Sequence, residues 1–288
     1  MSAGGPLGGV VAATVTPLRD GGQALDRPAV ARLTEFLREA GATGVFVAGT
    51  TGEGLLLDLH ERMALAEQFL EDAGGLRVAI HAGAQTTADA VRLAEHARDA
   101  GAAAVAAVAP PFYRLDDAEL AVHFAAVAGA CAPVPFYLYE FAARAGYAIP
   151  PRVVRELQDR VGNLAGMKVS DPQLQDVEAY LLPGLDLLVG SEALIPDALA
   201  LGAVGAVSGL AAAFPRTVVR VLEGAEPPRT VASLRAALAR HPFQAALKTA
   251  LVDQGVLSDA SVRAPLRGLT ASERSALAAD DLVRSALR

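Results

Sequence analysis

Two lysines stand out in this chain, because arginine supplies almost all of its positive charge. Of the 25 Lys and Arg residues among 288, only Lys168 and Lys248 are lysine. Lys168 lies in the apolar segment Leu164–Val169, where burying an ammonium is costly and favours the neutral amine. A neutral amine can attack a ketone and form a Schiff base, whose iminium accepts electrons as a carbon–carbon bond breaks or forms. Lys168 is therefore a candidate nucleophile, and arginine could not replace it.

A salt bridge is the simpler use for a lysine in this position. The side chain could extend from the strand end toward Asp171 or Glu140. Arginine would serve that purpose equally well, and this chain uses arginine almost everywhere else, so the chemical role is favoured. Lys248 lies at helical spacing in the C-terminal part of the chain, and we expect it to be an ordinary exposed lysine.

Two further segments carry polar residues directly after apolar runs. The segment Gly49–Gly54 reads GTTGEG, so its backbone N–H groups and two hydroxyls could hold a small anion. An ordinary turn between a strand and a helix, capped by threonine, is the alternative. In Phe136–Glu140, alternation places Tyr137 and Tyr139 on the same face of a strand, but it does not say whether that face is inward.

The histidines and the single cysteine do not predict a metal site. Cys131 is alone, and the five histidines show no HxH or HxxxH spacing, so we expect neither a metal nor another cofactor. His81 is the histidine that could face a site at a strand end, and a histidine with satisfied hydrogen bonds in the core is favoured over a ligand. These residues are His60, His81, His96, His123 and His241.

The elements that must position these residues repeat eight times along the chain. Short β-branched or apolar runs alternate with stretches of helical period, which predicts parallel strands joined by helices. The predicted strands are Val10–Thr16, Val45–Gly49, Arg77–Ala82, Ala104–Ala109, Phe136–Tyr139, Leu164–Val169, Leu185–Val189 and Ala203–Ser208. The predicted helices are Pro28–Ala40 with Asp26 as its cap, Leu59–Ala73 after Asp58, Ala88–Ala100, Asp117–Gly129, Pro151–Arg160, Pro172–Leu181, Ala193–Leu201 and Pro215–Glu223.

Eight such units predict an α/β protein of the (β/α)8, or TIM barrel, class. A doubly wound sheet is the alternative, but the expected GxGxxG turn does not follow the first strand. We assign residues 1–224 to the barrel and residues 225–288 to a C-terminal helical extension packed on it. The helices predicted in the extension are Thr230–Arg240, Phe243–Gly255 and Ala271–Leu287.

Composition narrows the partners and the compartment. The net charge is −7 and no Lys/Arg cluster occurs, which argues against nucleic acid or an anionic membrane as a partner. No apolar run approaches the length of a membrane span, and the first ten residues do not resemble an export signal. One cysteine cannot form an intramolecular disulfide, which suits a reducing compartment. We therefore expect a cytoplasmic protein.

Three motifs in this order resemble the dihydrodipicolinate synthase and N-acetylneuraminate lyase family. They are GTTGE at 49–53, YxYE with a following ArgxGly at 137–146, and Gly-x-Lys at 166–168, and the likeness extends from Val11 to the helical tail. The resemblance implies a cofactor-free class I lyase that handles pyruvate or another 2-oxo acid together with an aldehyde. Members are usually homotetramers, so it also implies a homo-oligomer.

The resemblance also implies roles for individual residues. Lys168 matches the Schiff-base lysine, and Tyr139 matches the tyrosine that moves a proton, so these two and Thr50 are the candidate catalytic residues. Thr50 and Thr51 would hold the pyruvate carboxylate, and the backbone carbonyl of Val207 would lie near the bound pyruvate. A second relay tyrosine aligns with Phe112 or, with a gap, Tyr113. Arg144 matches the residue that holds the carboxylate of aspartate semialdehyde in the synthases.

Departures from the synthase pattern favour another substrate. The synthase reading Tyr-Asn-Val-Pro-x-Arg-Thr-Gly is replaced at 139–146 by YEFAARAG, and the usual acidic residue after the lysine is Val169. The segment Gly190–Ile195, with Glu192, is similar to aldolases that act on 2-keto-3-deoxy sugar acids, and Ser208 could add a contact. We therefore favour a sugar-acid aldolase over 4-hydroxy-tetrahydrodipicolinate synthase. A dehydratase and a non-catalytic 2-oxo acid binding protein of the same family remain alternatives. A phosphate-binding barrel is disfavoured, because the loops after the seventh and eighth strands carry an acidic residue and few glycines.

Overall fold

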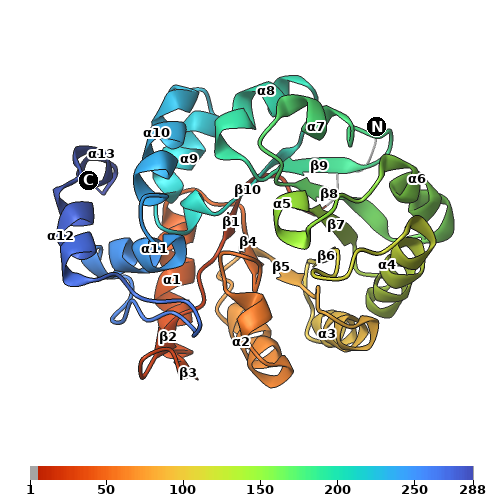
Figure 1. Ribbon diagram of the computed structural model, residues 1–288, viewed down its shortest axis with the longest axis horizontal. Coiled ribbons are helices and arrows are strands. Elements are labelled where there is room, and N and C mark those ends of the chain that lie inside the picture. Colours follow the sequence, from red (N-terminus) through yellow and green to blue (C-terminus); the bar gives the residue numbers. More distant parts are fainter. Residues whose placement is uncertain (1–5, 288) are drawn as a thin grey trace.

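The protein is a closed barrel of eight parallel strands surrounded by helices (Figure 1). The computed structural model describes residues 6–287. The first five residues of the predicted barrel segment and the last residue of the predicted extension lie outside it. The barrel order is β1-β10-β9-β8-β7-β6-β5-β4, closed by pairing of β1 with β4. The strands are β1 (Gly9–Ala13), β4 (Gly44–Val47), β5 (Arg77–His81), β6 (Ala104–Val108), β7 (Phe136–Glu140), β8 (Leu164–Val169), β9 (Asp186–Val189) and β10 (Gly205–Ser208). The predicted α/β, TIM-barrel fold is confirmed.

A two-stranded hairpin follows β1 and was not predicted. Its strands are β2 (Leu18–Arg19) and β3 (Ala24–Leu25), which pair antiparallel. The first strand also ends earlier than predicted, at Ala13, where its pairing with Phe46 of β4 ends. The apolar pattern continues to Thr16 because the loop beyond Ala13 is buried as well, so burial alone overestimates the strand.

The helices around the barrel follow the predicted stretches, with corrections at several ends. The helix α2 begins after Asp58 as predicted, and Asp58 accepts a hydrogen bond from Glu61 N at 2.8 Å in a capping box. Asp26 does not cap α1. Arg27 occupies that position in a helical conformation without a side-chain cap, because Pro28 sets the first turn. The helices are α1 (Pro28–Glu39), α2 (Leu59–Glu71), α3 (Thr87–Asp99), α4 (Asp117–Cys131), α5 (Ala142–Ala145), α6 (Pro151–Arg160), α7 (Leu174–Glu178), α8 (Ile195–Ala200) and α9 (Pro215–Leu222).

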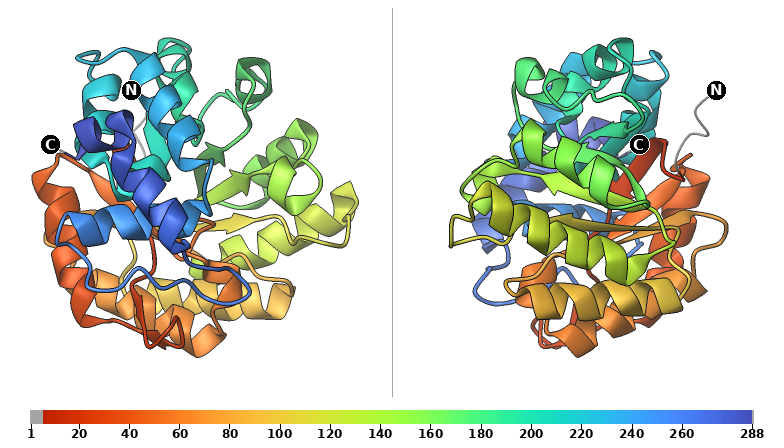
Figure 2. Two further views of the ribbon diagram at one scale, coloured as in Figure 1. Left: turned by 60° about the vertical axis from the view of Figure 1, so that its left-hand side comes forward. Right: turned by 90° about the vertical axis from the view of Figure 1, so that its right-hand side faces the viewer.

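The helices after α9 form the C-terminal part, drawn in blue in Figure 2; the first of them packs beside α9, and later ones lie next to the red and orange N-terminal elements. They are α10 (Pro228–Leu238), α11 (Phe243–Asp253), α12 (Ala271–Ala279) and α13 (Asp281–Ala286). The single helix predicted over Ala271–Leu287 is wrong, because Asp280 interrupts it and caps α13 by accepting hydrogen bonds from Leu282 N and Val283 N. The division at residues 224 and 225 stays a prediction.

Two layers of apolar side chains make the core. The larger one lies between the strands and the helices, and the smaller one fills the barrel interior. Small residues such as Ala79, Ala104 and Ala106 occupy the interior, together with the rings of Phe46 and Tyr139. The interior is therefore packed and leaves room for a ligand at one end. Among the helices of residues 6–287, none is long and apolar enough to cross a membrane.

Candidate active site

Strands β7 and β8 bring Tyr139 and Lys168 side by side at the carboxyl end of the barrel. The two residues are register partners in the parallel pair. The Lys168 Nζ atom lies 3.6 Å from the centroid of the Tyr139 ring and 4.7 Å from that of Phe46. Tyr137 and Tyr139 both belong to the barrel interior. The sequence placed them on one face of the strand without saying which, and that face points inward. The carboxyl end is where barrel enzymes place their chemistry.

Lys168 is buried, but it has no carboxylate partner in the part of the chain that the structure describes. Its residue surface is 5% exposed, and it forms no ion pair within residues 6–287. The salt bridge considered from the sequence, to Asp171 or Glu140, is therefore absent from the part of the chain that the structure describes. The amine instead lies against two aromatic faces and lines a cavity.

The turn after β4 places Thr50 over Tyr139. Thr50 Oγ1 and Tyr139 Oη are 3.2 Å apart, within hydrogen-bond distance. The turn is closed by hydrogen bonds from Glu53 N to the Thr50 carbonyl (3.3 Å) and from Gly54 N to the Gly49 carbonyl (3.1 Å). Position 54 requires glycine, because a Cβ there would lie 1.7 Å from the carbonyl oxygen of Ala48. The sequence GTTGEG thus folds into a compact turn that presents a hydroxyl to the barrel mouth.

A cavity of about 340 Å³ gathers most of the predicted site residues at this end of the barrel. The predicted residues that line it are Thr50, Thr51, Tyr139, Arg144, Lys168, Glu192 and Val207. A second cavity of about 220 Å³ lies beside it and shares Thr50 and Arg144. The structure therefore brings together side chains from strands and loops that are far apart in the sequence.

Tyr113 and Phe112 do not line either cavity. Their side chains are 67% and 86% exposed, and their rings pack edge to face with centroids 4.9 Å apart. Phe112 has a φ of +81°, a backbone conformation that residues other than glycine rarely adopt. Neither ring reaches Tyr139 within the described chain, so their relay role stays a prediction.

Glu192 and Ser208 form a hydrogen bond with each other rather than being left free for a ligand. Ser208 Oγ donates to Glu192 Oε1 at 2.9 Å, and Leu210 N donates to the same oxygen at 2.9 Å. The serine oxygen in turn accepts a hydrogen bond from Ala211 N at 3.0 Å. These bonds hold the loops after β9 and β10 together at the cavity wall, and the substrate-binding role of Glu192 stays a prediction.

Three cavity residues come from the C-terminal helices and were missed from the sequence. Arg235 of α10 lies over the ring of Phe243 in α11, with its guanidinium carbon 3.7 Å from the ring centroid. Gln244 donates from its amide to the Thr50 carbonyl at 3.3 Å. Nothing in their local sequence distinguishes these residues from ordinary helix-surface residues, because their place in the site depends on how the extension packs.

His81 lies near the barrel mouth, and burial is the largest influence on its pKa. His81 is 2% exposed, and burial, Arg62 and Lys168 together lower its pKa well below the ordinary value. Its Nδ1 lies 3.1 Å from the Ala48 carbonyl and its Nε2 accepts from Val108 N at 3.3 Å, so the neutral ring is satisfied on both sides. His81 is thus a buried histidine with satisfied hydrogen bonds, as favoured from the sequence, and it also lines the second cavity. Within residues 6–287, no group of His, Cys, Asp and Glu could hold a metal.

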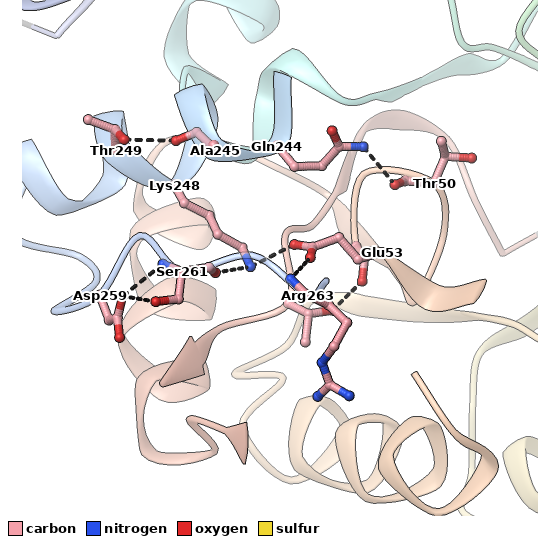
Figure 3. Close-up of polar contacts among 11 residues, drawn as sticks. Thr50, Glu53, Gln244, Ala245, Lys248, Thr249, Asp259, Ser261 and Arg263 are labelled. Carbon is pink, nitrogen blue, oxygen red and sulfur yellow. Dashed lines mark hydrogen bonds and ion pairs between the residues drawn. The ribbon is translucent and has the colours of Figure 1, made fainter. Parts of the chain in front are cut away.

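Lys248 is fully buried, so the prediction of an exposed lysine is wrong. Its Nζ atom lies 2.6 Å from Glu53 Oε1 and 2.7 Å from the Ser261 carbonyl oxygen (Figure 3). Glu53 belongs to the turn that carries Thr50, far from Lys248 in the sequence. The helical spacing around Lys248 gave no sign of this partner, because the contact exists only after the C-terminal part packs on the barrel.

Comparison with known proteins decides the family. The sequence profile of the Dihydrodipicolinate synthetase family matches residues 6–282. The chain belongs to this family. It is 35% identical over 293 residues to an uncharacterized DapA-like lyase of Halobacterium salinarum, which covers 96% of this chain and 94% of that protein. It is also 34% identical over 210 residues to the N-acetylneuraminate lyase of Rattus norvegicus, covering 70% of this chain and 65% of the rat protein.

A solved structure of the dihydrodipicolinate synthetase family shows the same architecture. This is YagE, a prophage protein from E. coli K12 of the dihydrodipicolinic acid synthase family, in complex with pyruvate. The TM-score is 0.91 at 25% identity, over 97% of this chain and 98% of that one. The resemblance inferred from the three motifs is thereby confirmed, and this protein is a member of a family of lyases and synthases.

Proposed function

We propose that this protein is a class I lyase that forms a Schiff base between Lys168 and a 2-oxo acid. The observation that carries the proposal is the environment of Lys168: a buried residue that lines the cavity and has no carboxylate partner among residues 6–287. A lysine kept for charge pairing would have such a partner, whereas a nucleophilic amine must be free to react. The pyruvate bound by the similar protein YagE supports a 2-oxo acid as the ligand.

The groups around Lys168 fit the two ends of a 2-oxo acid. Thr50 and Thr51 line the same cavity and would hold the carboxylate through hydroxyl and backbone groups. The C2 ketone would then lie toward Lys168 Nζ. Tyr139, hydrogen-bonded to Thr50, is placed to move a proton between the reacting atoms and the Thr50 hydroxyl.

Cleavage begins at the C2 ketone of the 2-oxo acid. The Lys168 amine adds to C2, and Tyr139 donates its proton to the departing hydroxyl, so that loss of water gives a protonated imine and leaves Tyr139 as the phenolate. Tyr139 takes the proton from the hydroxyl on C4 as the C3–C4 bond breaks, and the bonding electrons move into the imine to give an enamine. The aldehyde leaves, C3 of the enamine gains a proton, and water hydrolyses the imine to release pyruvate and the free lysine. The scheme uses no metal and no other cofactor.

A 2-keto-3-deoxy sugar acid is the substrate that we favour. Ser170, Ser191 and Gln244 also line the cavity and supply hydrogen-bonding groups for a hydroxylated chain. The name of the rat relative, a lyase, agrees with cleavage as the direction of reaction. We also propose that the protein acts as a homo-oligomer in the cytoplasm.

Condensation of pyruvate with aspartate semialdehyde is the second candidate, and Arg144 favours it. Arg144 lines the cavity and its guanidinium forms no ion pair within the described residues, so it is free to bind a second carboxylate. A neutral sugar chain makes no such demand. Assays of both reactions therefore separate the two candidates.

Reductive trapping tests the proposal. Borohydride is added to the protein with pyruvate, and peptide mass spectrometry locates the modification, which we expect on Lys168. Lys168→Arg should keep the charge and remain folded but lose both trapping and turnover. Modification absent from Lys168 in the wild-type protein would refute the mechanism.

Turnover is measured separately from trapping. A panel of 2-keto-3-deoxy sugar acids is assayed by coupling pyruvate release to lactate dehydrogenase, beside a condensation assay with pyruvate and aspartate semialdehyde. Trapping without aldehyde release from any compound would favour the non-catalytic binding protein, and water loss without cleavage would favour the dehydratase.

A further inference from the structure

The turn that carries Thr50 is held from outside the barrel by a buried ion pair. Lys248 of α11 and Glu53 of the turn are each fully buried at the side chain, with Nζ and Oε1 2.6 Å apart (Figure 3). Few charged pairs are buried so completely, because removing two charges from water is costly unless their geometry and further hydrogen bonds compensate. We therefore expect a structural or functional role for this buried ion pair.

Both charged groups have additional partners from the C-terminal part of the chain. Glu53 Oε2 accepts a hydrogen bond from Arg263 N at 2.6 Å, and Lys248 Nζ donates to the Ser261 carbonyl at 2.7 Å. The guanidinium of Arg263 pairs with Glu61 of α2 at 2.6 Å. The ion pair therefore joins the turn after β4 to α11 and to the segment that follows it.

The backbone at Glu53 shows why the turn needs an external anchor. Glu53 has a φ of +58°, in the left-handed region that disfavours side chains other than glycine. Such a conformation persists only where surrounding contacts determine it. Its N–H closes the turn onto the Thr50 carbonyl, so the conformation of residue 53 and the position of Thr50 are linked directly.

A second contact from the same helix reaches the same residue. Gln244, one turn before Lys248 on α11, donates to the Thr50 carbonyl at 3.3 Å. Figure 3 shows both side chains extending from α11 toward the turn. The helix thus holds the turn at Thr50 and at Glu53, on either side of Thr51.

We propose that Lys248 and Glu53 are positioning residues for substrate carboxylate recognition. Their ion pair fixes the turn so that the Thr50 and Thr51 hydroxyls face the cavity beside Lys168. The inference rests on the proposed function, in which that turn holds the carboxylate of the 2-oxo acid. It also gives the C-terminal extension a part in substrate binding and assigns a use to the second lysine of the chain.

The test measures how imine formation depends on pyruvate concentration. Wild-type protein, Lys248→Met, Glu53→Gln and the double variant are trapped with borohydride over a pyruvate series, and modified Lys168 is quantified by mass spectrometry. We expect the half-saturating pyruvate concentration to rise about tenfold or more in Lys248→Met, with the limiting trapping rate nearly unchanged, as for loss of ground-state binding. The double variant should be no worse than the more affected single variant, because the two residues act as one unit.

A matched control separates positioning from loss of stability. Leu247 is fully buried on the same helix, and its apolar side chain takes no part in the Lys248–Glu53 ion pair, so Leu247→Ala removes packing and leaves the ion pair. We expect this variant to melt at a lower temperature and to keep the wild-type half-saturation. Circular dichroism checks that each variant is folded.

Each outcome decides between the two proposals. No trapping in wild-type protein refutes the proposed function itself. Normal trapping in wild-type protein together with unchanged half-saturation in Lys248→Met and Glu53→Gln overturns the positioning role alone. Equal rises in Leu247→Ala, or failure of both single variants to fold, would assign the pair to stability and would also overturn it.

Discussion

Glu140 provides a direct test of the electrostatics at the carboxyl end of β7. It follows Tyr139, its side chain is fully buried, and its Oε2 accepts a hydrogen bond from Ile149 N at 2.6 Å. Burial raises the pKa of this carboxyl from 4.5 to about 7. Glu140→Gln keeps the shape and an acceptor for Ile149 N but removes the charge, so it isolates the effect of ionisation.

The sign and size of the effect follow from that pKa. Between about pH 4.5 and 7 the folded protein holds the proton and the unfolded chain does not, so the free energy of unfolding falls as pH rises. The shift corresponds to about 3 kcal/mol of the free energy of unfolding. The wild-type protein has this stabilisation below about pH 4.5 and has lost it above about pH 7. Glu140→Gln lacks this loss. Its stability relative to wild type should therefore increase by about 3 kcal/mol from pH 4.5 to pH 8.

Urea unfolding followed by far-ultraviolet circular dichroism measures this difference, since the chain contains no tryptophan. Comparison with wild type at each pH cancels contributions from other groups, such as His123, whose pKa burial lowers to about 4. Glu178→Gln, at an exposed position on α7, is the matched control and should show no pH-dependent difference. A constant difference between Glu140→Gln and wild type across this range would refute the reasoning.

Three further predictions concern the site. Tyr139→Phe should lower kcat about a hundredfold or more, because the phenol that contacts Thr50 at 3.2 Å is lost as acid and base; steady-state pyruvate release measures this, and a change under threefold would contradict it. Arg144→Ala should raise KM about tenfold or more for aspartate semialdehyde but not for a sugar acid whose chain beyond C2 is uncharged, and equal effects on both in the two assays would contradict the proposed role. Gly54→Ala should destabilise the protein by about 1–3 kcal/mol, because its Cβ would meet the Ala48 carbonyl oxygen at 1.7 Å, and urea unfolding equal to wild type would contradict this.

The barrel was predictable because its signals are local. Apolar strands such as Leu164–Val169 and helices such as Pro151–Arg160 coincide with the predicted ranges, since burial on both faces and proline at a helix start leave direct marks in the sequence. Boundaries failed where a capping contact or strand pairing decided the end, as at Asp280 and Ala13. These depend on single hydrogen bonds that composition does not record.

The candidate site was partly predictable for a related reason. In a barrel all strands end at the same mouth, so knowing that Lys168, Tyr139 and Thr50 follow or end strands already predicts that they meet. Which loops close over them is a different matter. Arg235 and Gln244 reach the cavity from the C-terminal helices, and no local pattern marks them.

The two lysines separate what sequence and tertiary structure each decided. By itself the sequence determined the barrel and singled out Lys168 as the candidate nucleophile, because an amine in an apolar strand is anomalous wherever the strand lies. Lys248 looked ordinary, since helical spacing says nothing about a partner far away along the chain. Only the packing of α11 on the turn after β4 buries Lys248 together with Glu53. Because both charges are removed from water there, each needs the other as a partner.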